Sequence, residues 1–184
     1  MMCSHPVKSA NAYFIEGNAQ FQHGNHAEAF KSYQQVIRID PKQYHAYLNA
    51  GNALVQLKHY ALAVEYFGHA IGLDKHCKTA FYNRASVHTR LEQYDQALLD
   101  YATVLEIDPN AVEAYLNRGS VYMKLGEVTL AVEDFSQAIV FKKNIWQAYY
   151  NRALAYEKLN QIEKAQEDFV TAIRLKTETH KPYR

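Results

Sequence analysis

The chain has 184 residues, a hydrophobic fraction of 48% and 20 Lys and Arg against 19 Asp and Glu, a composition that fits an ordinary globular protein and excludes a disordered chain. Its formal net charge of +1 supplies no broad cationic field, so we expect neither nucleic acid nor a membrane to be a partner. Because it has no apolar segment of membrane-spanning length, no secretory signal in residues 1–10 and only two cysteines, we expect a cytoplasmic protein without a disulfide framework.

A period of 34 residues organises the sequence from Ala10 onward. In each repeat, apolar residues recur at helical spacing in two stretches, and a polar pair such as Gly24-Asn25 separates them. We therefore predict an all-α fold of five successive helical hairpins. The expected divisions are an N-terminal extension at 1–9, repeats at 10–43, 44–77, 78–111, 112–145 and 146–179, and a C-terminal tail at 180–184.

Four positions of the repeat, numbered from its first residue, carry the same kind of side chain throughout. Position 4 is aromatic, position 8 is Gly or Ala, position 20 is Ala and position 24 is aromatic. A small residue at position 8 predicts that the second helix of each hairpin closely approaches the backbone of the first. Asp40-Pro41 and Asp108-Pro109 predict where two second helices end, because proline disfavours helical geometry in the preceding residue. The ends of the other three second helices are predicted from the period alone.

On these positions the chain resembles the tetratricopeptide repeat family, whose pattern also has a frequent proline at position 32. The resemblance covers residues 10–179. It implies a right-handed superhelical α-solenoid in which the first helices line a concave groove. It also implies a non-enzymatic interaction module, or adaptor, that binds another protein or a peptide.

Position 6 forms a ladder of Asn49, Asn83, Asn117 and Asn151 on successive first helices. An asparagine amide both donates and accepts hydrogen bonds, so it can pair with the backbone of an extended peptide without selecting its sequence. The alternative is that duplication copied one solvated asparagine. By family geometry, positions 5, 9 and 13 face the same groove. The predicted peptide-binding residues are Asn18, Asn49, Asn52, Asn83, Asn117, Asn151, Arg90, Lys124, Lys158, Phe14, Leu48, Tyr82 and Tyr150.

The cations at position 13 occur only in the last three repeats, so the predicted groove is basic toward its C-terminal half. A ligand with acidic residues at that end would fit, whereas the alternative is a solvated basic row.

Arginine at position 7 occurs only in repeats with aspartate at position 23. We interpret these residues as structural ion pairs within hairpins. The predicted pairs are Arg84 with Asp100, Arg118 with Asp134, and Arg152 with Asp168.

Two further functions are disfavoured by the residues present. The carboxylate clamp of chaperone adaptors needs three cations, and in the register that starts at repeat 1 their places hold Phe14, Thr79 and Asn83. The chain has no Gly-rich phosphate loop and no His-Glu-x-x-His, Gly-x-Ser-x-Gly or Cys-x-x-Cys motif. His23 and His26 have no further ligand in their turn. We therefore predict no enzymatic activity, no cofactor and no metal site.

The last repeat has no following hairpin to cover its apolar side, which includes Ile162, Phe169 and Ile173. Three explanations remain open: the chain is a fragment of a longer array, two copies meet through these residues as a homodimer, or another protein covers them. The second explanation makes the chain a self-assembling structural scaffold, which is the alternative to a peptide-binding adaptor.

Overall fold

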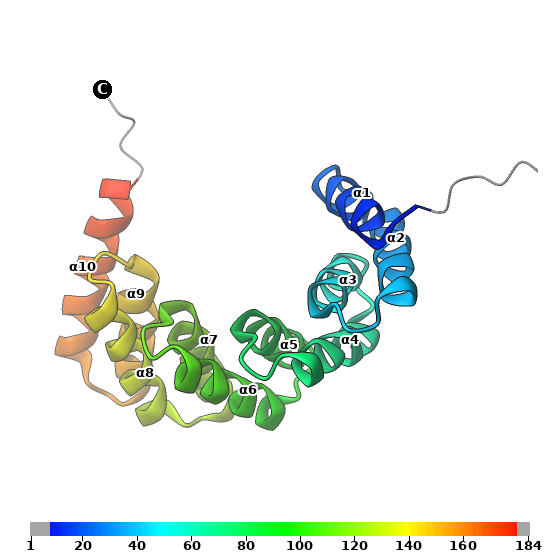
Figure 1. Ribbon diagram of the computed structural model, residues 1–184. Helices are drawn as coiled ribbons and strands as arrows, with labels where there is room; N and C mark the ends of the chain where they lie inside the picture. The colour runs from blue at the N-terminus through cyan, green and yellow to red at the C-terminus, as the bar shows by residue number, and fades with distance from the viewer. Residues whose placement is uncertain (1–7, 180–184) are drawn as a thin grey trace, which may run out of the picture. The chain divides into compact units, whose positions relative to one another are not determined.

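The computed structural model describes residues 8–179, which form ten α-helices in five hairpins and contain no β-strand (Figure 1). The predicted terminal segments lie almost entirely outside the described residues. The helices are α1 Ala10–Gln22, α2 His26–Ile39, α3 Tyr44–Gln56, α4 Tyr60–Leu73, α5 Lys78–Arg90, α6 Tyr94–Ile107, α7 Val112–Leu125, α8 Val128–Phe141, α9 Trp146–Lys158 and α10 Ile162–Thr179. Every first helix begins at position 1 of a repeat and every second helix at position 17.

The chain divides into two compact units: unit 1 ends at Leu91 and contains α1 to α5, and unit 2 begins at Glu92 and contains α6 to α10. Within unit 1, each helix packs against the next in sequence, and α1, α3 and α5 also contact one another in succession. In unit 2, α6 packs on α7, and α7, α8, α9 and α10 follow in the same way. Each unit is therefore built from contacts between neighbouring helices.

The turn inside every hairpin contains a residue with positive φ at position 15. Gly24 and Gly126 have φ of 79° and 82°, and Asn160 has 58°, as expected for residues that tolerate this conformation. Lys58 and Glu92 adopt it as well, with φ of 62° and 58°. In four hairpins, the N–H of position 16 donates to the carbonyl of position 11 at 2.9 Å, which satisfies a carbonyl left unpaired at the helix end.

Four second helices, α2, α4, α6 and α8, end on an extended residue at position 31, whereas α10 continues past the end expected from the period to Thr179. In the first three repeats the residue at position 31 is aspartate, and its Oδ1 accepts a hydrogen bond from the backbone N–H two residues later, at 3.1 Å in Asp40, 2.9 Å in Asp74 and 3.1 Å in Asp108. Asp74 makes this turn with Lys75 in place of proline. The aspartate side chain is therefore sufficient to hold the turn between hairpins.

The hairpins close through contact between position 24 and the backbone at position 8. Phe67 is fully buried, and a Cβ placed on Gly51 would lie 2.5 Å from its Cε1 atom. Gly17 against Tyr33 and Gly119 against Phe135 show the same approach, with distances of 2.7 Å. The alanine at position 20 is also buried in every repeat. The expected close approach of the two helices is confirmed in these three hairpins.

We expect Gly51→Ala to destabilise the protein by about 1–2 kcal/mol. Overpacking against Phe67 costs about 1–3 kcal/mol, and the better helix propensity of alanine offsets at most ~1 kcal/mol. The matched control is Gly72→Ala in α4, where nothing lies within 4 Å of the added methyl group, so this change should stabilise by about 0.5–1 kcal/mol. Urea unfolding measures both. Equal effects of the two substitutions would contradict the packing explanation.

Candidate functional site: a groove on the first helices

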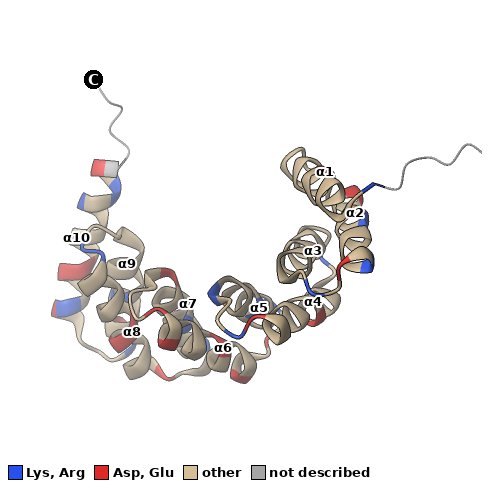
Figure 2. Cartoon of the chain, viewed as in Figure 1, with Lys and Arg blue, Asp and Glu red and all other residues tan. Residues whose placement is uncertain are grey.

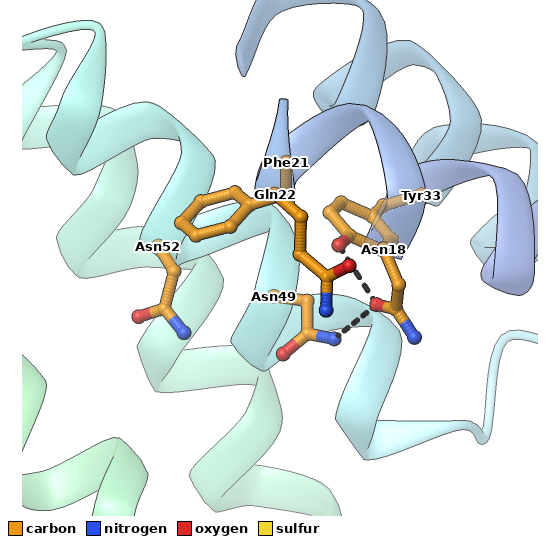
Figure 3. Close-up of a pocket in the computed structure, with 6 residues that line it drawn as sticks. All are labelled: Asn18, Phe21, Gln22, Tyr33, Asn49 and Asn52. Carbon is orange, nitrogen blue, oxygen red and sulfur yellow. Dashed lines mark hydrogen bonds between the residues drawn. The ribbon is translucent and has the colours of Figure 1, made fainter. Parts of the chain in front are cut away.

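Two adjoining hollows lie along the first helices of unit 1. The first has a volume of about 180 Å³ and is lined by Asn18, Phe21, Gln22, Tyr33, Asn49 and Asn52 (Figure 3). The second has a volume of about 220 Å³ and is lined by Phe21, Asn52, Val55, Gln56, Asn83, Ser86, Val87 and Arg90. Because Phe21 and Asn52 line both, the hollows form one continuous groove across α1, α3 and α5, which we call the unit 1 groove.

The floor of the unit 1 groove contains hydrogen bonds between asparagines of neighbouring repeats. Asn49 Nδ2 donates to Asn18 Oδ1 at 3.1 Å (Figure 3). Asn83 Nδ2 donates to Asn52 Oδ1 at 2.7 Å. Each pair, which we call an asparagine rung, joins position 6 of one repeat to position 9 of the repeat before. A rung uses one N–H of the position-6 amide, and an asparagine amide has a second N–H and a carbonyl oxygen that can form further hydrogen bonds.

The buried Tyr33 side chain forms a hydrogen bond to the first rung. Its hydroxyl donates to Asn18 Oδ1 at 2.9 Å although only 1% of the residue is exposed. Burial raises the pKa of the Tyr33 phenol, and a hydrogen bond with Asn49 acts in the opposite direction. The phenol therefore remains a protonated donor at neutral pH. The sequence predicts only that position 24 is aromatic, and the signal for this role is the hydroxyl of a tyrosine, which stands at position 24 in repeats 1 and 3.

Two of the predicted apolar binding residues, Leu48 and Phe14, pack mainly inside the fold. Leu48 is only 8% exposed and belongs to the same core cluster of unit 1 as Phe67. Phe14 is half-buried, with its ring 6.0 Å from that of Tyr33, and so packs mainly inside its hairpin. The aromatic residue that lines both hollows is Phe21, which the prediction of binding residues omitted.

The remaining predicted residues lie on first helices but in different surroundings. Tyr82 on α5 is half-buried, whereas Arg90 is exposed at the last turn of that helix. In unit 2, Asn117 and Asn151 are half-buried, and Tyr150 is exposed. Lys124 and Lys158 are exposed at the ends of α7 and α9. The role of these residues in binding stays a prediction.

The asparagine rung is a feature of unit 1. In unit 2, the residue at position 9 before Asn151 is Ser120, whose hydroxyl donates to the Leu116 carbonyl of its own helix at 2.8 Å. The surroundings of the rungs are also weakly charged. Helix α3 contains no Asp, Glu, Lys or Arg, and Figure 2 shows α1 and α3 almost free of charged residues. A ligand therefore meets mainly amides and apolar groups there.

Arginine and aspartate make bidentate ion pairs within two hairpins of unit 2. Arg118 donates from Nε and Nη2 to the two carboxylate oxygens of Asp134 at 2.9 and 2.7 Å, and Arg152 binds Asp168 in the same way at 2.7 and 2.9 Å. Arg152 also donates to Ser136 Oγ at 3.0 Å, which links hairpin 5 to hairpin 4.

The burial of the Arg118–Asp134 ion pair indicates a structural role. Asp134 raises the pKa of Arg118 through their hydrogen bond, whereas burial raises the pKa of Asp134 despite its cation. The desolvation cost thus cancels much of the attraction, as is usual for buried pairs. Arg84 on α5 and Asp100, which is buried on α6, hold the equivalent positions, and their pairing stays a prediction.

Among residues 8–179, no group of three or more His, Cys, Asp or Glu side chains is placed to hold a metal ion. No helix in this range combines the length and apolar character needed to cross a lipid bilayer.

The repeated hairpins define the chain as an all-α solenoid. A TPR repeat model matches residues 17–58, 85–126 and 119–160, and two further tetratricopeptide repeat models match residues 44–77 and 146–176. The chain therefore belongs to the tetratricopeptide repeat family, and the predicted family and fold class are confirmed. This family defines it as a protein–protein interaction module.

Solved structures show the same fold. A crystal structure of MamA is 22% identical and has a TM-score of 0.86, with coverage of 95% of this chain and 97% of that one. MamA from Desulfovibrio magneticus RS-1 is 19% identical with a TM-score of 0.89, and the match covers 96% of this chain and 100% of that one. YrrB, described as a TPR protein with an unusual peptide-binding site, is 25% identical with a TM-score of 0.78. The match covers 91% of this chain and 86% of that one. No curated protein matches the sequence.

We expect Arg118→Met to destabilise the protein by about 3 kcal/mol, because it leaves the buried carboxylate of Asp134 without its cation. Arg118→Met combined with Asp134→Leu should cost less than the single change, since no charge is then stranded. The control is the exposed Lys31–Glu28 pair, where Lys31→Met should change stability by less than ~0.5 kcal/mol. Denaturant unfolding measures all three, and a double variant as unstable as Arg118→Met would disprove the explanation.

Proposed function

We propose that the chain is an adaptor that binds an extended peptide segment of a partner protein in the unit 1 groove. The observation that carries this proposal is the pair of asparagine rungs, which repeat the same bond one repeat apart on the floor of a continuous groove. The rungs fix the amides and leave donors and acceptors for a peptide backbone. A preorganised row of this kind binds extended chain with little entropic cost in the protein.

Three further features support the proposal. The groove is lined by amides and Phe21, so backbone contacts can be made with little selection of ligand sequence. Asn117 and Asn151 offer further amides in unit 2, and the exposed Lys124 and Lys158 favour acidic residues in a ligand that reaches them. YrrB is a repeat protein of the same fold whose description includes a peptide-binding site. The expected cytoplasmic location and the expected lack of enzymatic activity suit such an adaptor.

Replacing both rung donors in the variant Asn49→Ala/Asn83→Ala should weaken peptide binding roughly tenfold or more. Each amide loses hydrogen bonds worth about 0.5–1.5 kcal/mol, and its rung partner is released. Peptides selected from a random library with the wild-type protein provide the probes, and fluorescence anisotropy gives their dissociation constants.

The matched control is Asn110→Ala/Asn144→Ala, which removes two exposed asparagines outside the groove. It should bind as the wild type does. Asn117→Ala/Asn151→Ala tests separately whether the ligand extends into unit 2. Circular dichroism confirms that each variant is folded. Unchanged affinity in the Asn49→Ala/Asn83→Ala protein would contradict the proposed site.

A second candidate function, self-assembly through α10, is favoured by one observation. Val170 and Ile173 are 67% and 65% exposed, and Ile162 beside them is 48% exposed. In repeat 2, the residue equivalent to Ile173 is Ile71, which is only 7% exposed because α5 covers it. We therefore take the occupant of the α10 face to be a first helix from a second copy of the chain. Phe169 contributes less, since its half-buried ring packs edge-on against Tyr150.

For this candidate, Val170→Lys/Ile173→Lys should abolish any concentration-dependent increase in mass, because two ammonium groups cannot be buried in an apolar contact. Multi-angle light scattering over a range of concentrations measures the mass. Leu99→Lys, on the equally exposed Leu99 of α6, is the control and should leave association unchanged. A wild-type protein that stays monomeric at the highest concentration excludes the scaffold.

A further inference from the structure

The unit 1 groove carries a charge only at its α5 end. Of the residues that line the two hollows, Arg90 alone has a charged side chain, and no carboxylate lines either hollow. Gln22 and Gln56 hold the same position 13 in repeats 1 and 2 and are neutral. Arg90 is exposed and has no ion-pair partner among residues 8–179. Its guanidinium is therefore available to an anionic group of a ligand.

The spacing of the rungs sets the register of an extended ligand. The two rungs are related by one repeat, and packed helices such as α1, α3 and α5 lie about 8–10 Å apart. An extended chain rises about 3.1–3.4 Å per residue, so three ligand residues span the distance from one rung to the next. Residues i and i+3 of the ligand then meet successive rungs.

We propose that the ligand of the unit 1 groove carries an acidic side chain at the Asn52–Asn83 rung and an uncharged residue three positions away at the Asn18–Asn49 rung. This inference rests on the proposed function. At the second rung, Arg90 can bind a carboxylate through two parallel N–H groups, and Ser86 and Gln56 add neutral donors in the same hollow. At the first rung the lining offers only amides, Tyr33 and Phe21, so a carboxylate would lose hydration without meeting a cation.

The geometry of α5 indicates a side-chain carboxylate rather than the end of a chain. Asn83 and Arg90 are seven residues apart on one helix, which corresponds to ~10 Å along its axis. A terminal carboxylate held at the rung belongs to the backbone and so lies far from the guanidinium. A side chain that leaves the backbone at the rung reaches toward Arg90. The longer glutamate is therefore favoured over aspartate.

The test is a selection from random peptides about twelve residues long, joined to the support through their C-termini so that no free carboxylate is present. The protein carries Lys124→Gln and Lys158→Gln, which leaves Arg90 as the cation at position 13. We expect selected peptides to be enriched roughly fivefold in glutamate at one position. Arg90→Gln should remove this enrichment. Lys42→Gln makes the same charge change outside the hollows and should leave it unchanged.

A gain-of-charge variant tests the register. Gln22→Arg places a guanidinium beside the first hollow, so its selected peptides should contain a second glutamate three residues from the first. A second glutamate at another spacing, or none, overturns the register. Glutamate enrichment that persists in Arg90→Gln overturns the assignment of the anion.

Two outcomes separate this inference from other possibilities. If no variant enriches any peptide, the proposed function itself fails. If peptides are enriched without any preference for glutamate, the groove binds peptide and only the present inference fails. Synthetic peptides with an internal glutamine and a free C-terminus complete the comparison. Tighter, Arg90-dependent binding of these peptides than of amidated peptides with an internal glutamate would assign Arg90 to a terminal carboxylate instead.

Discussion

The close contact between an aromatic ring and a helix backbone determines both the hairpin and the groove. In repeat 1, the ring of Tyr33 lies so near α1 that a Cβ on Gly17 would be 2.7 Å from its Cε1 atom. Because the ring lies against the helix, its hydroxyl reaches Asn18, the residue that follows Gly17. The packing of Tyr33 that closes the hairpin therefore also places its hydroxyl where it donates to Asn18 of the first asparagine rung. Stability and the candidate site share one contact.

Much of the fold could be predicted because the same residue types recur at the same positions in all five repeats. Small residues at position 8 and aromatic residues at position 24 indicated the contact that the structure contains, and the period located the start of every helix. Lys58 and Glu92 at positive φ were not anticipated, since neither residue favours that conformation locally. The packing of the two helices imposes the turn, and a single residue's preference is too weak to resist it.

The candidate site was predicted only in part, because residue type does not reveal partners. The position-6 asparagines were selected for their free amides, yet Asn49 and Asn83 each donate to an asparagine 31 residues earlier. Such bonds depend on how neighbouring repeats stack, which the period alone does not specify. Family geometry directs position 5 to the groove, but Leu48 is only 8% exposed and belongs to the core of unit 1.

The three hydrogen bonds Tyr33–Asn18, Asn49–Asn18 and Asn83–Asn52 join residues 15 or 31 positions apart, within one hairpin or between adjacent hairpins. Cooperativity in such an array passes only from neighbour to neighbour, so a terminal hairpin can open while the others stay folded. Opening of α1 and α2 would remove Asn18 and Phe21, and with them half of the groove. A ligand lying across α1, α3 and α5 would therefore bind the folded array and suppress this local unfolding, which couples recognition directly to the order of the first hairpin.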